Sequence, residues 1–214
     1  MSRLATSEST GVSLSAREFL RRATHAEHVR LNQHPLLSGI TRPGYPVGRY
    51  ANVLVAYYHF YRVFESAIDE SLTRLKHDFS YEDRRKLPWL AEDLDKLGID
   101  PDSAAWTSSS RLAVPDALNA SQVFGVLYTI EGSSLGGKVI AAHLAANLGL
   151  SASNGARFFT GYGEAVGTCW QTFAVRLESQ LADSATRAQA GNAARLTFCT
   201  MEQVLDEQAN HRPG

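Results

Sequence analysis

The sequence predicts an all-α domain of six or more helices. Two observations support this: long segments in which apolar residues recur every three or four positions, and short segments rich in Gly, Pro and Ser between them. The chain has 214 residues, 44% of them hydrophobic, which is enough for one globular domain with a real core. We expect this domain to span 13–210 and the polar, Ser/Thr-rich residues 1–12 to form a flexible tail.

The first helix is expected to begin at Ser15, because Ser15 and Glu18 form a Ser-x-x-Glu capping box. It runs through EFLRRATHAEHVRLNQ and stops before Pro35. Spacings of four, four and three positions place four residues on one face of this helix: Leu20, Thr24, His28 and Leu31. This face should point into the protein.

Five further helices are expected after the loop LLSGITRPGYP. The first of them has five aromatic residues within 57–64, too many for one face, so it should be buried on more than one side. Four of the five segments are 47–76, 119–148, 164–182 and 185–208. The remaining helix, second in order, follows Ser80, carries Pro88 and closes at Gly98.

The charge pattern gives no sign of a nucleic-acid partner, because the formal net charge is −1. The dense basic run Arg84-Arg85-Lys86 is flanked by acidic residues on both sides. We interpret this run as a solvated helix face.

Two cysteines, Cys169 and Cys199, have neither CxxC nor zinc-ligand spacing, so we expect buried thiols in a reducing compartment. The N-terminus lacks the apolar segment of a secretory signal. No apolar run has the length that a membrane span requires. These features predict a cytoplasmic protein with no membrane partner.

Three glycines lie in the middle of the helix predicted at 119–148: Gly132, Gly136 and Gly137. Each costs about 1 kcal/mol relative to alanine in a helix interior, so the helix needs a reason to carry them. Small residues four positions apart form a smooth stripe. The stripe either lets a neighbouring backbone pack closely or makes room for a large flat ligand, over which the helix bends. Three glycines and two serines within six residues favour the ligand.

His28 differs from the other histidines because it lies on the face predicted to point inward. A buried imidazole needs a hydrogen bond or a metal, and His25, three residues earlier, could share that metal. A carboxylate-bridged di-iron site would need Glu-x-x-His motifs, and none of the twelve glutamates has His three residues later. One axial histidine opposite a wall of small residues fits haem better.

Two segments together resemble the haem oxygenases. LRRATHAEHVRL resembles their proximal helix, in which Thr precedes the iron-binding His by four residues, and LYTIEGSSLGGKVI resembles their distal helix with its Gly-Gly step. RRKLPWLAEDLDKLG and GARFFTGYGEAVGTCWQTF resemble the bacterial biliverdin-producing branch. The resemblance implies a multi-helix haem oxygenase-like fold, with haem between the first helix and a glycine-kinked distal helix.

On the proximal side, the resemblance implies that His28 binds the haem iron through Nε2 as a neutral ligand and that Thr24 belongs to the cofactor-binding motif. The Nδ1–H of this ring needs an acceptor. Many family members have Glu four residues after the His. Asn32 stands there, and its amide oxygen could accept the bond, whereas Glu27 lies about 100° around the helix and is a poor substitute.

On the distal side, the resemblance implies that the backbone of Gly136 and Gly137 lies against the haem face. Ser133 stands where the mammalian-type enzymes have a distal Asp. We therefore expect Ser133, Ser134 and backbone carbonyls to hold a water network that delivers protons. Three cations are candidates to bind the haem propionates: Arg21, Lys138 and Arg176.

The activity implied by the resemblance is oxidative cleavage of haem to biliverdin, carbon monoxide and ferrous iron. It would use O₂ and electrons from an external donor, a ferredoxin or a reductase. The related branch includes enzymes that supply chromophore to bacteriophytochromes, so such a receptor is a candidate partner. Two alternatives stay open: a haem- or bilin-binding carrier or sensor on the same fold without turnover, and a structural helical interaction module that binds no haem.

Overall fold

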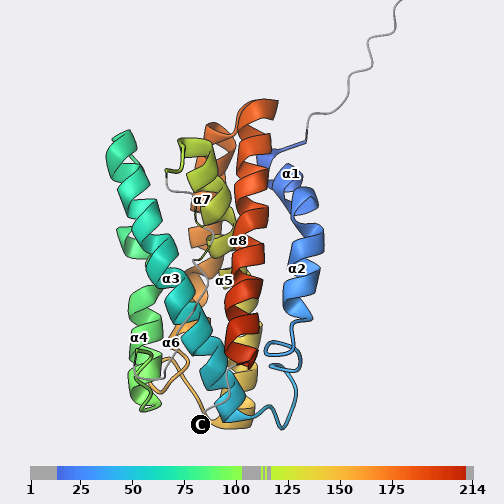
Figure 1. Ribbon diagram of the computed structural model, residues 1–214, viewed down its shortest axis with the longest axis vertical. Helices are drawn as coiled ribbons and strands as arrows, with labels where there is room; N and C mark the ends of the chain where they lie inside the picture. The colour runs from blue at the N-terminus through green and yellow to red at the C-terminus, as the bar shows by residue number, and fades with distance from the viewer. Residues whose placement is uncertain (1–13, 103–111, 113, 115–116, 211–214) are drawn as a thin grey trace, which may run out of the picture.

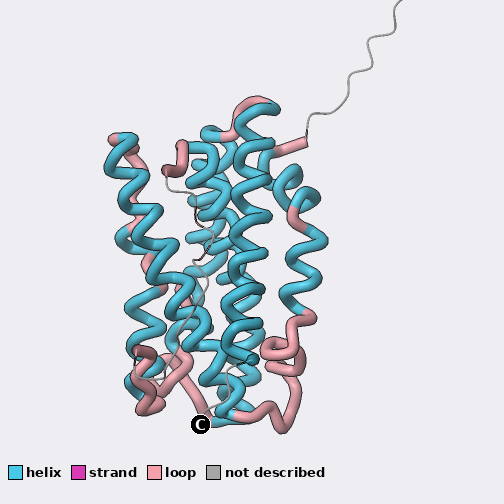
Figure 2. Tube along the Cα trace, viewed as in Figure 1, coloured by secondary structure: helices cyan, strands magenta, loops and turns pink. Residues whose placement is uncertain are grey.

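The computed structural model describes residues 14–102, 112, 114 and 117–210. The predicted tail at 1–12 lies outside the described residues. Over the described part the fold is all-α, as predicted (Figures 1 and 2). The elements are α1 (Ala16–Ala23), α2 (His25–Asn32), α3 (Val47–Leu75), η1 (Glu82–Arg84), α4 (Leu87–Lys96), α5 (Ala120–Leu148), α6 (Arg157–Thr160), η2 (Gly163–Ala165), α7 (Val166–Gln180) and α8 (Ser184–Asn210).

The single first helix that we predicted is divided into α1 and α2, because the backbone breaks at Thr24 (φ −108°, ψ 4°). The Thr24 hydroxyl donates to the Leu20 carbonyl at 2.8 Å, and such back-bonding bends helices. At the start of α1, the Ser15 hydroxyl accepts from the Glu18 N–H at 3.1 Å, as predicted. The Glu18 carboxylate binds Arg21 at 2.8 Å instead of completing the capping box.

The predicted second helix is α3, and it is buried on more than one side as expected. Its fully or almost fully buried aromatic residues are Tyr50, Tyr57, Phe60, Tyr61 and Phe64. The predicted third helix forms as two parts, η1 and α4, with Pro88 in the first turn of α4. Proline is tolerated there because the N–H that it lacks has no partner within the helix.

The glycine-bearing helix is α5, which is continuous through all three central glycines. Asn119 and Gln122 form a complete capping box at its start, and Gly149 ends it in a left-handed conformation (φ 66°). The last two predicted helices correspond to α7 and α8 within two residues at each end. None of the helices in the described ranges combines the length and apolar character that a membrane span requires.

The long helix α8 lies at the centre of the bundle. In Figure 1, α1 and α2 run along one side of α8, and α3 and α4 lie on the other side. The most extensive helix pair is α5 with α8. These two helices approach closely at Gly125, where an added Cβ would lie 2.8 Å from the Cα of Ala190. This packing holds α5 in place opposite α1 and α2.

Two predictions about exposure are wrong. The run Arg84-Arg85-Lys86 is not a solvated helix face, because Lys86 is only 2% exposed and ion-paired inside the protein. The two cysteines are free thiols, as expected, but Cys199 is exposed and Cys169 is half-buried. Helical spacing alone did not show which side of α7 and α8 faces solvent.

Candidate functional site

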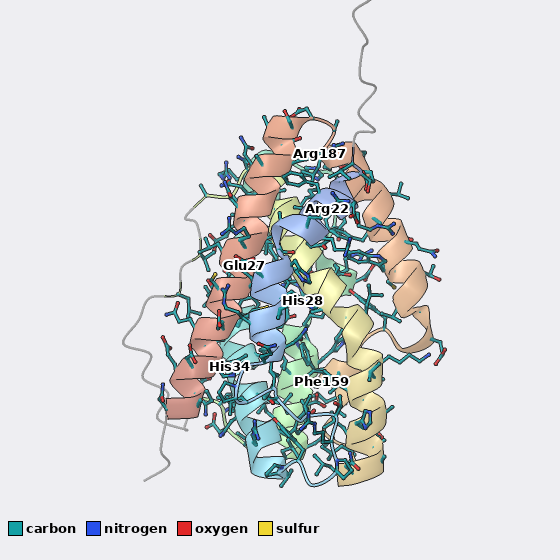
Figure 3. All side chains as sticks on the ribbon, turned by 90° about the vertical axis from the view of Figure 1, so that its right-hand side faces the viewer. Arg22, Glu27, His28, His34, Phe159 and Arg187 are labelled. Carbon is teal, nitrogen blue, oxygen red and sulfur yellow. The ribbon has the colours of Figure 1, made fainter. Side chains whose placement is uncertain are left out.

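A cavity of about 830 Å³ lies between α1–α2 on one side and α5 on the other. Figure 3 shows His28 of α2 and Phe159 of α6 in the region between α2 and α5. Aromatic side chains from four other helices complete the lining: Tyr57 and Tyr61 of α3, Phe158 and Phe159 of α6, Trp170 of α7 and Phe198 of α8. An apolar lining with a few polar groups is typical of a small-molecule or cofactor site.

His28 presents its imidazole to this cavity. The side chain is exposed, not buried as its helical face predicted, because the cavity rather than the packed core lies on that face. Phe198 packs edge-on against the ring, with 5.8 Å between ring centroids. Burial lowers the pKa of His28, and the nearby His25 lowers it further. The ring is therefore neutral at pH 7, as a metal-binding imidazole must be.

Asn32 contacts the His28 ring at a different nitrogen from the one expected. Its amide nitrogen lies 3.3 Å from Nε2, the atom that the resemblance assigns to iron. Residues four apart meet on one helix face, which brings this amide and the ring together. Glu27 points away from the ring, as expected, and accepts from Arg195 of α8 at 3.1 Å.

Thr24 and Arg21 both line the cavity. Thr24 is buried and its hydroxyl is bound to Leu20, so it shapes the backbone break that orients α2. Arg21 is largely exposed and paired with Glu18 at 2.8 Å. Exposed ion pairs of this kind contribute little stability, so the guanidinium is available to bind an anionic group at the cavity mouth.

Lys138 and Arg176, the other two predicted propionate ligands, do not line the cavity. Lys138 follows Gly137 by 100° around α5 and binds Glu164 of η2 at 3.2 Å. Arg176 occupies an exposed position of α7 and binds Asp78 at 3.2 Å. Among the described residues, the arginine and lysine side chains that do line the cavity are Arg17, Arg21 and Lys86.

The two glycines of the Gly-Gly step have different surroundings. A Cβ at Gly136 would meet none of the described atoms within 4 Å outside its own helix turn, so this position is open toward the cavity. A Cβ at Gly137 would lie 2.6 Å from the carbonyl oxygen of Phe159, so this glycine lets α6 pack on α5. The stripe therefore serves both purposes considered above: Gly137 allows close packing, and Gly136 leaves room.

Ser133 lies on the same wall, one turn before Gly136. Its hydroxyl donates to the Ile130 carbonyl at 2.7 Å, which leaves its oxygen free to accept. The Tyr61 hydroxyl, also lining the cavity, is buried and has no hydrogen bond among the described residues. Burial raises the pKa of Tyr61, and the neighbouring Ser133 hydroxyl partly opposes this. These two hydroxyls can hold a water or a polar ligand atom.

Comparison with known proteins identifies the family of this chain. The sequence pattern of the family described as "Heme oxygenase" matches residues 14–207. The chain belongs to the haem oxygenase family. A curated relative named heme oxygenase, from Xanthomonas campestris pv. campestris (strain 8004), is 32% identical over 160 residues, which cover 75% of this chain and 90% of the relative.

Solved haem oxygenases share the fold. The enzyme from Neisseria meningitidis, solved with NO and CO bound, has a TM-score of 0.73 at 22% identity and covers 92% of each chain. Heme oxygenase-2 from Synechocystis sp. PCC 6803, solved with heme and NO, has a TM-score of 0.73 at 17% identity and covers 91% of this chain and 85% of that one. The haem oxygenase fold that the resemblance implied is confirmed.

The Gly-Gly step offers a matched pair of substitutions in this haem oxygenase family member. Gly136→Ala should raise the unfolding free energy of the haem-free protein by up to about 1 kcal/mol, because the methyl group enters open space. It should also weaken haem binding. Gly137→Ala should lower the unfolding free energy by about 1–3 kcal/mol, because α6 must move. Urea unfolding and haemin titration test both, and wild-type haem affinity in Gly136→Ala would contradict the assignment.

Asp93 of α4 holds α6 in place at the end of the cavity. Its buried carboxylate accepts from the backbone N–H groups of Arg157 at 2.6 Å and Phe158 at 2.8 Å. These are N–H groups of the first helical turn, which have no partner within α6. Burial raises the pKa of Asp93 from 3.8 to about 6, although the two backbone hydrogen bonds oppose this shift.

The raised pKa of Asp93 predicts a pH-dependent stability. Between pH 3.8 and about 6 the folded protein retains the Asp93 proton that the unfolded chain has lost, so stability falls as pH rises through this window. The loss corresponds to about 3 kcal/mol. The asparagine side chain in Asp93→Asn cannot ionise. The difference in unfolding free energy, wild type minus variant, should therefore decrease as the pH rises from about 4 to about 7. Urea unfolding across this range tests it; a constant difference would contradict it.

Several residues on the far walls of the cavity were not predicted from the sequence: Tyr57, Tyr61, Lys86, Phe158, Phe159 and Trp170. The excess of aromatic residues in 57–64 was a usable signal, because a helix with two buried faces can place a tyrosine on each. No sequence pattern indicated that Lys86 is buried. It follows two arginines, and a run of three basic residues is typical of a charged surface.

Proposed function

We propose that this protein is an enzyme that cleaves haem to biliverdin, carbon monoxide and ferrous iron, with O₂ and electrons from an external ferredoxin or reductase. The observation that carries the proposal is the cavity between α2 and α5, where one helix supplies a neutral His28 imidazole and the other the bare backbone of Gly136. Membership of the haem oxygenase family supports haem as the ligand.

The residues of the cavity fit haem. Its volume lies within the range of about 300–1,000 Å³ usual for cofactor pockets. Gly136 leaves space that a Cβ would fill, and the exposed ring of His28 reaches into the cavity. Iron at Nε2 would displace the amide of Asn32. Arg17 and Arg21 lie among the lining residues and can bind the two propionates.

Bound haem would supply both the iron that activates O₂ and the porphyrin that is oxidised. The protein would bind the iron through His28, whose neutral imidazole gives less electronic push toward O–O cleavage than a thiolate. Gly136 leaves room on the distal side, and Ser133 with Tyr61 can position a water through which protons enter. The surrounding aromatic side chains exclude other water from the reacting face.

Aerobic turnover tests this function. The purified protein is mixed with haemin and then given ascorbate, or a ferredoxin with its reductase. We expect the Soret band to decay while bilin absorption rises, and chromatography to identify a biliverdin isomer. A Soret band that persists under both reductants, without any bilin, would overturn the proposed activity.

A haem- or bilin-binding carrier or sensor is the second candidate. Asn32 and Ser133 favour it, because both stand where the resemblance leads us to expect carboxylates. The carrier predicts that haem binds through His28 but is recovered intact after the same incubation. A structural helical module predicts instead that haemin added to the protein develops no bound spectrum.

We further propose a bacteriophytochrome as the acceptor of biliverdin. The segments 84–98 and 155–173 support this, because they resemble the branch that supplies chromophore to these receptors. Co-expression of this protein with an apo-bacteriophytochrome should give a coloured, photoactive receptor. A receptor that stays colourless, while the His28-dependent turnover proceeds in the same cells, would argue against this partner.

A further inference from the structure

A buried group of charges forms part of the distal side of the cavity, which Lys86 lines. Lys86 and Glu131 are each only 2% exposed. The Lys86 ammonium donates to Glu131 Oε1 at 2.9 Å, to the Arg84 carbonyl at 2.6 Å and to the Tyr162 hydroxyl at 2.6 Å. All three of its N–H groups are thereby used, so the ammonium is held in one position.

Glu131 is equally well held. Arg84 donates to its Oε2 at 2.6 Å, and the Tyr162 hydroxyl lies 3.0 Å from both carboxylate oxygens. Burying such a pair costs several kcal/mol of desolvation per ion, and an apolar pair of the same size is often no less stable. A buried ion pair is thus weak evidence for a role in stability, and another role deserves a test.

This pair is adjacent to the distal side of the cavity. Lys86 itself is a lining residue, and Glu131 immediately precedes Gly132 and Ser133 on α5. The Tyr61 hydroxyl, which lines the same cavity, is buried and has no hydrogen bond among the described residues. Buried polar atoms are rarely left unpaired, so this hydroxyl indicates a place for a water or a polar ligand atom.

We propose that Lys86, held by Glu131, is a positioning residue for the distal side of the haem site. The fixed charges of this pair set the electrostatic potential at the distal water, and so the ease with which that water gives up a proton. The inference rests on the proposed function, because it requires haem in the cavity. It assigns to a buried ion pair the control over how readily the distal water loses its proton.

The charged and titratable groups that face Lys86 come from several elements: Glu131 of α5, Glu65 of α3, Arg84 of η1, and Tyr162. Glu65 accepts from the Lys86 backbone N–H and from Tyr81 at 3.1 Å. Burial lowers the pKa of Lys86, and Glu131 opposes that shift. Removing any one charge of this set should change the electrostatic potential at the distal water, in a direction given by the sign of the charge removed.

The test is a pH titration of the visible spectrum of the ferric haem complex without any reductant. The transition between its acid and alkaline forms reports loss of a proton from the distal water. Lys86→Met removes a positive charge and should move this transition about one pH unit higher. Glu131→Gln removes a negative charge and should move it lower by a similar amount.

Tyr162→Phe is the matched control, because it removes a hydrogen bond from the same pair without changing charge. Its shift should be smaller than either of the other two. Two outcomes would overturn the proposal, because both would indicate a general loosening of the distal wall. One is a shift of Lys86→Met and Glu131→Gln in the same direction. The other is a Tyr162→Phe shift as large as that of either charge variant.

A double variant keeps the test usable if either single variant fails to fold. In Lys86→Met/Glu131→Gln the two charge changes cancel, so the transition should lie close to that of wild type. A transition displaced by one unit or more would overturn the proposal. If haem binds with its His28-dependent spectrum and these shifts are absent, this inference fails while the proposed function stands. If the wild-type protein binds no haem, both fail.

Discussion

Replacing His28 by alanine should abolish the five-coordinate, histidine-ligated spectrum of the ferric haem complex and lower turnover by more than about 100-fold. Loss of groups that only support a metal ligand typically costs 10–100-fold, and loss of the ligand itself should cost more. Because His28 is exposed in the cavity, its removal should leave the haem-free fold intact. Absorption and resonance Raman spectra of the haem complex, with urea unfolding of the free protein, measure both effects.

Two neighbouring substitutions serve as controls for His28→Ala. Asn32→Ala removes the amide that contacts Nε2 but keeps the imidazole, so it should retain the histidine-ligated spectrum. His25→Ala removes the other histidine that lines the cavity and should also retain it. Added imidazole should partly restore the spectrum of His28→Ala. A histidine-ligated spectrum in His28→Ala that disappears in His25→Ala would move the ligand to His25.

The helices that the sequence predicted well are those with strong signals at both ends. The capping box at Asn119 and the glycine at 149 define α5 by local chemistry that acts before any tertiary contact forms. The aromatic excess in α3 likewise marks a helix buried on two faces. His28, which helical spacing placed on an inward-pointing face, and Gly136, which the resemblance placed at the site, both line one cavity.

What the sequence could not predict depends on contacts between distant segments. Lys138 and Arg176 were candidates because they are basic residues near the expected site, yet each is paired with an acidic residue away from the cavity. Lys86 had the opposite outcome: Glu131, 45 positions later, binds it inside the protein. Nothing near a lysine in the sequence shows whether such a partner exists.

The glycines show the same limit. Gly136 and Gly137 are adjacent and have the same residue type, but one faces open space and the other the Phe159 carbonyl. The distinction arises from α6, a four-residue helix that lies between the helices predicted at 119–148 and 164–182. A glycine stripe in a helix therefore indicates a close approach without showing whether ligand or backbone makes it. Among the described glycines, Gly125, which no sequence pattern singled out, makes the closest approach.

Gly125→Ala should lower the unfolding free energy by more than about 3 kcal/mol, a large part of the roughly 5–15 kcal/mol typical of a domain. An added Cβ would lie 2.8 Å from both the Cα and the carbonyl carbon of Ala190. Backbone atoms in the middle of a helix cannot move aside singly, so α5 and α8 would have to separate. Urea unfolding of the haem-free protein measures the loss.

Gly48→Ala is the matched control, since the same methyl group is added to a helix, near the start of α3, where no described atom lies within 4 Å. It should leave stability unchanged or raise it by up to about 1 kcal/mol. Because α5 carries the distal wall, Gly125→Ala should also weaken haem binding although Gly125 does not line the cavity. Equal unfolding free energies for Gly125→Ala and Gly48→Ala would contradict this prediction. They would show that the α5–α8 contact does not fix the distance from Gly136 to His28.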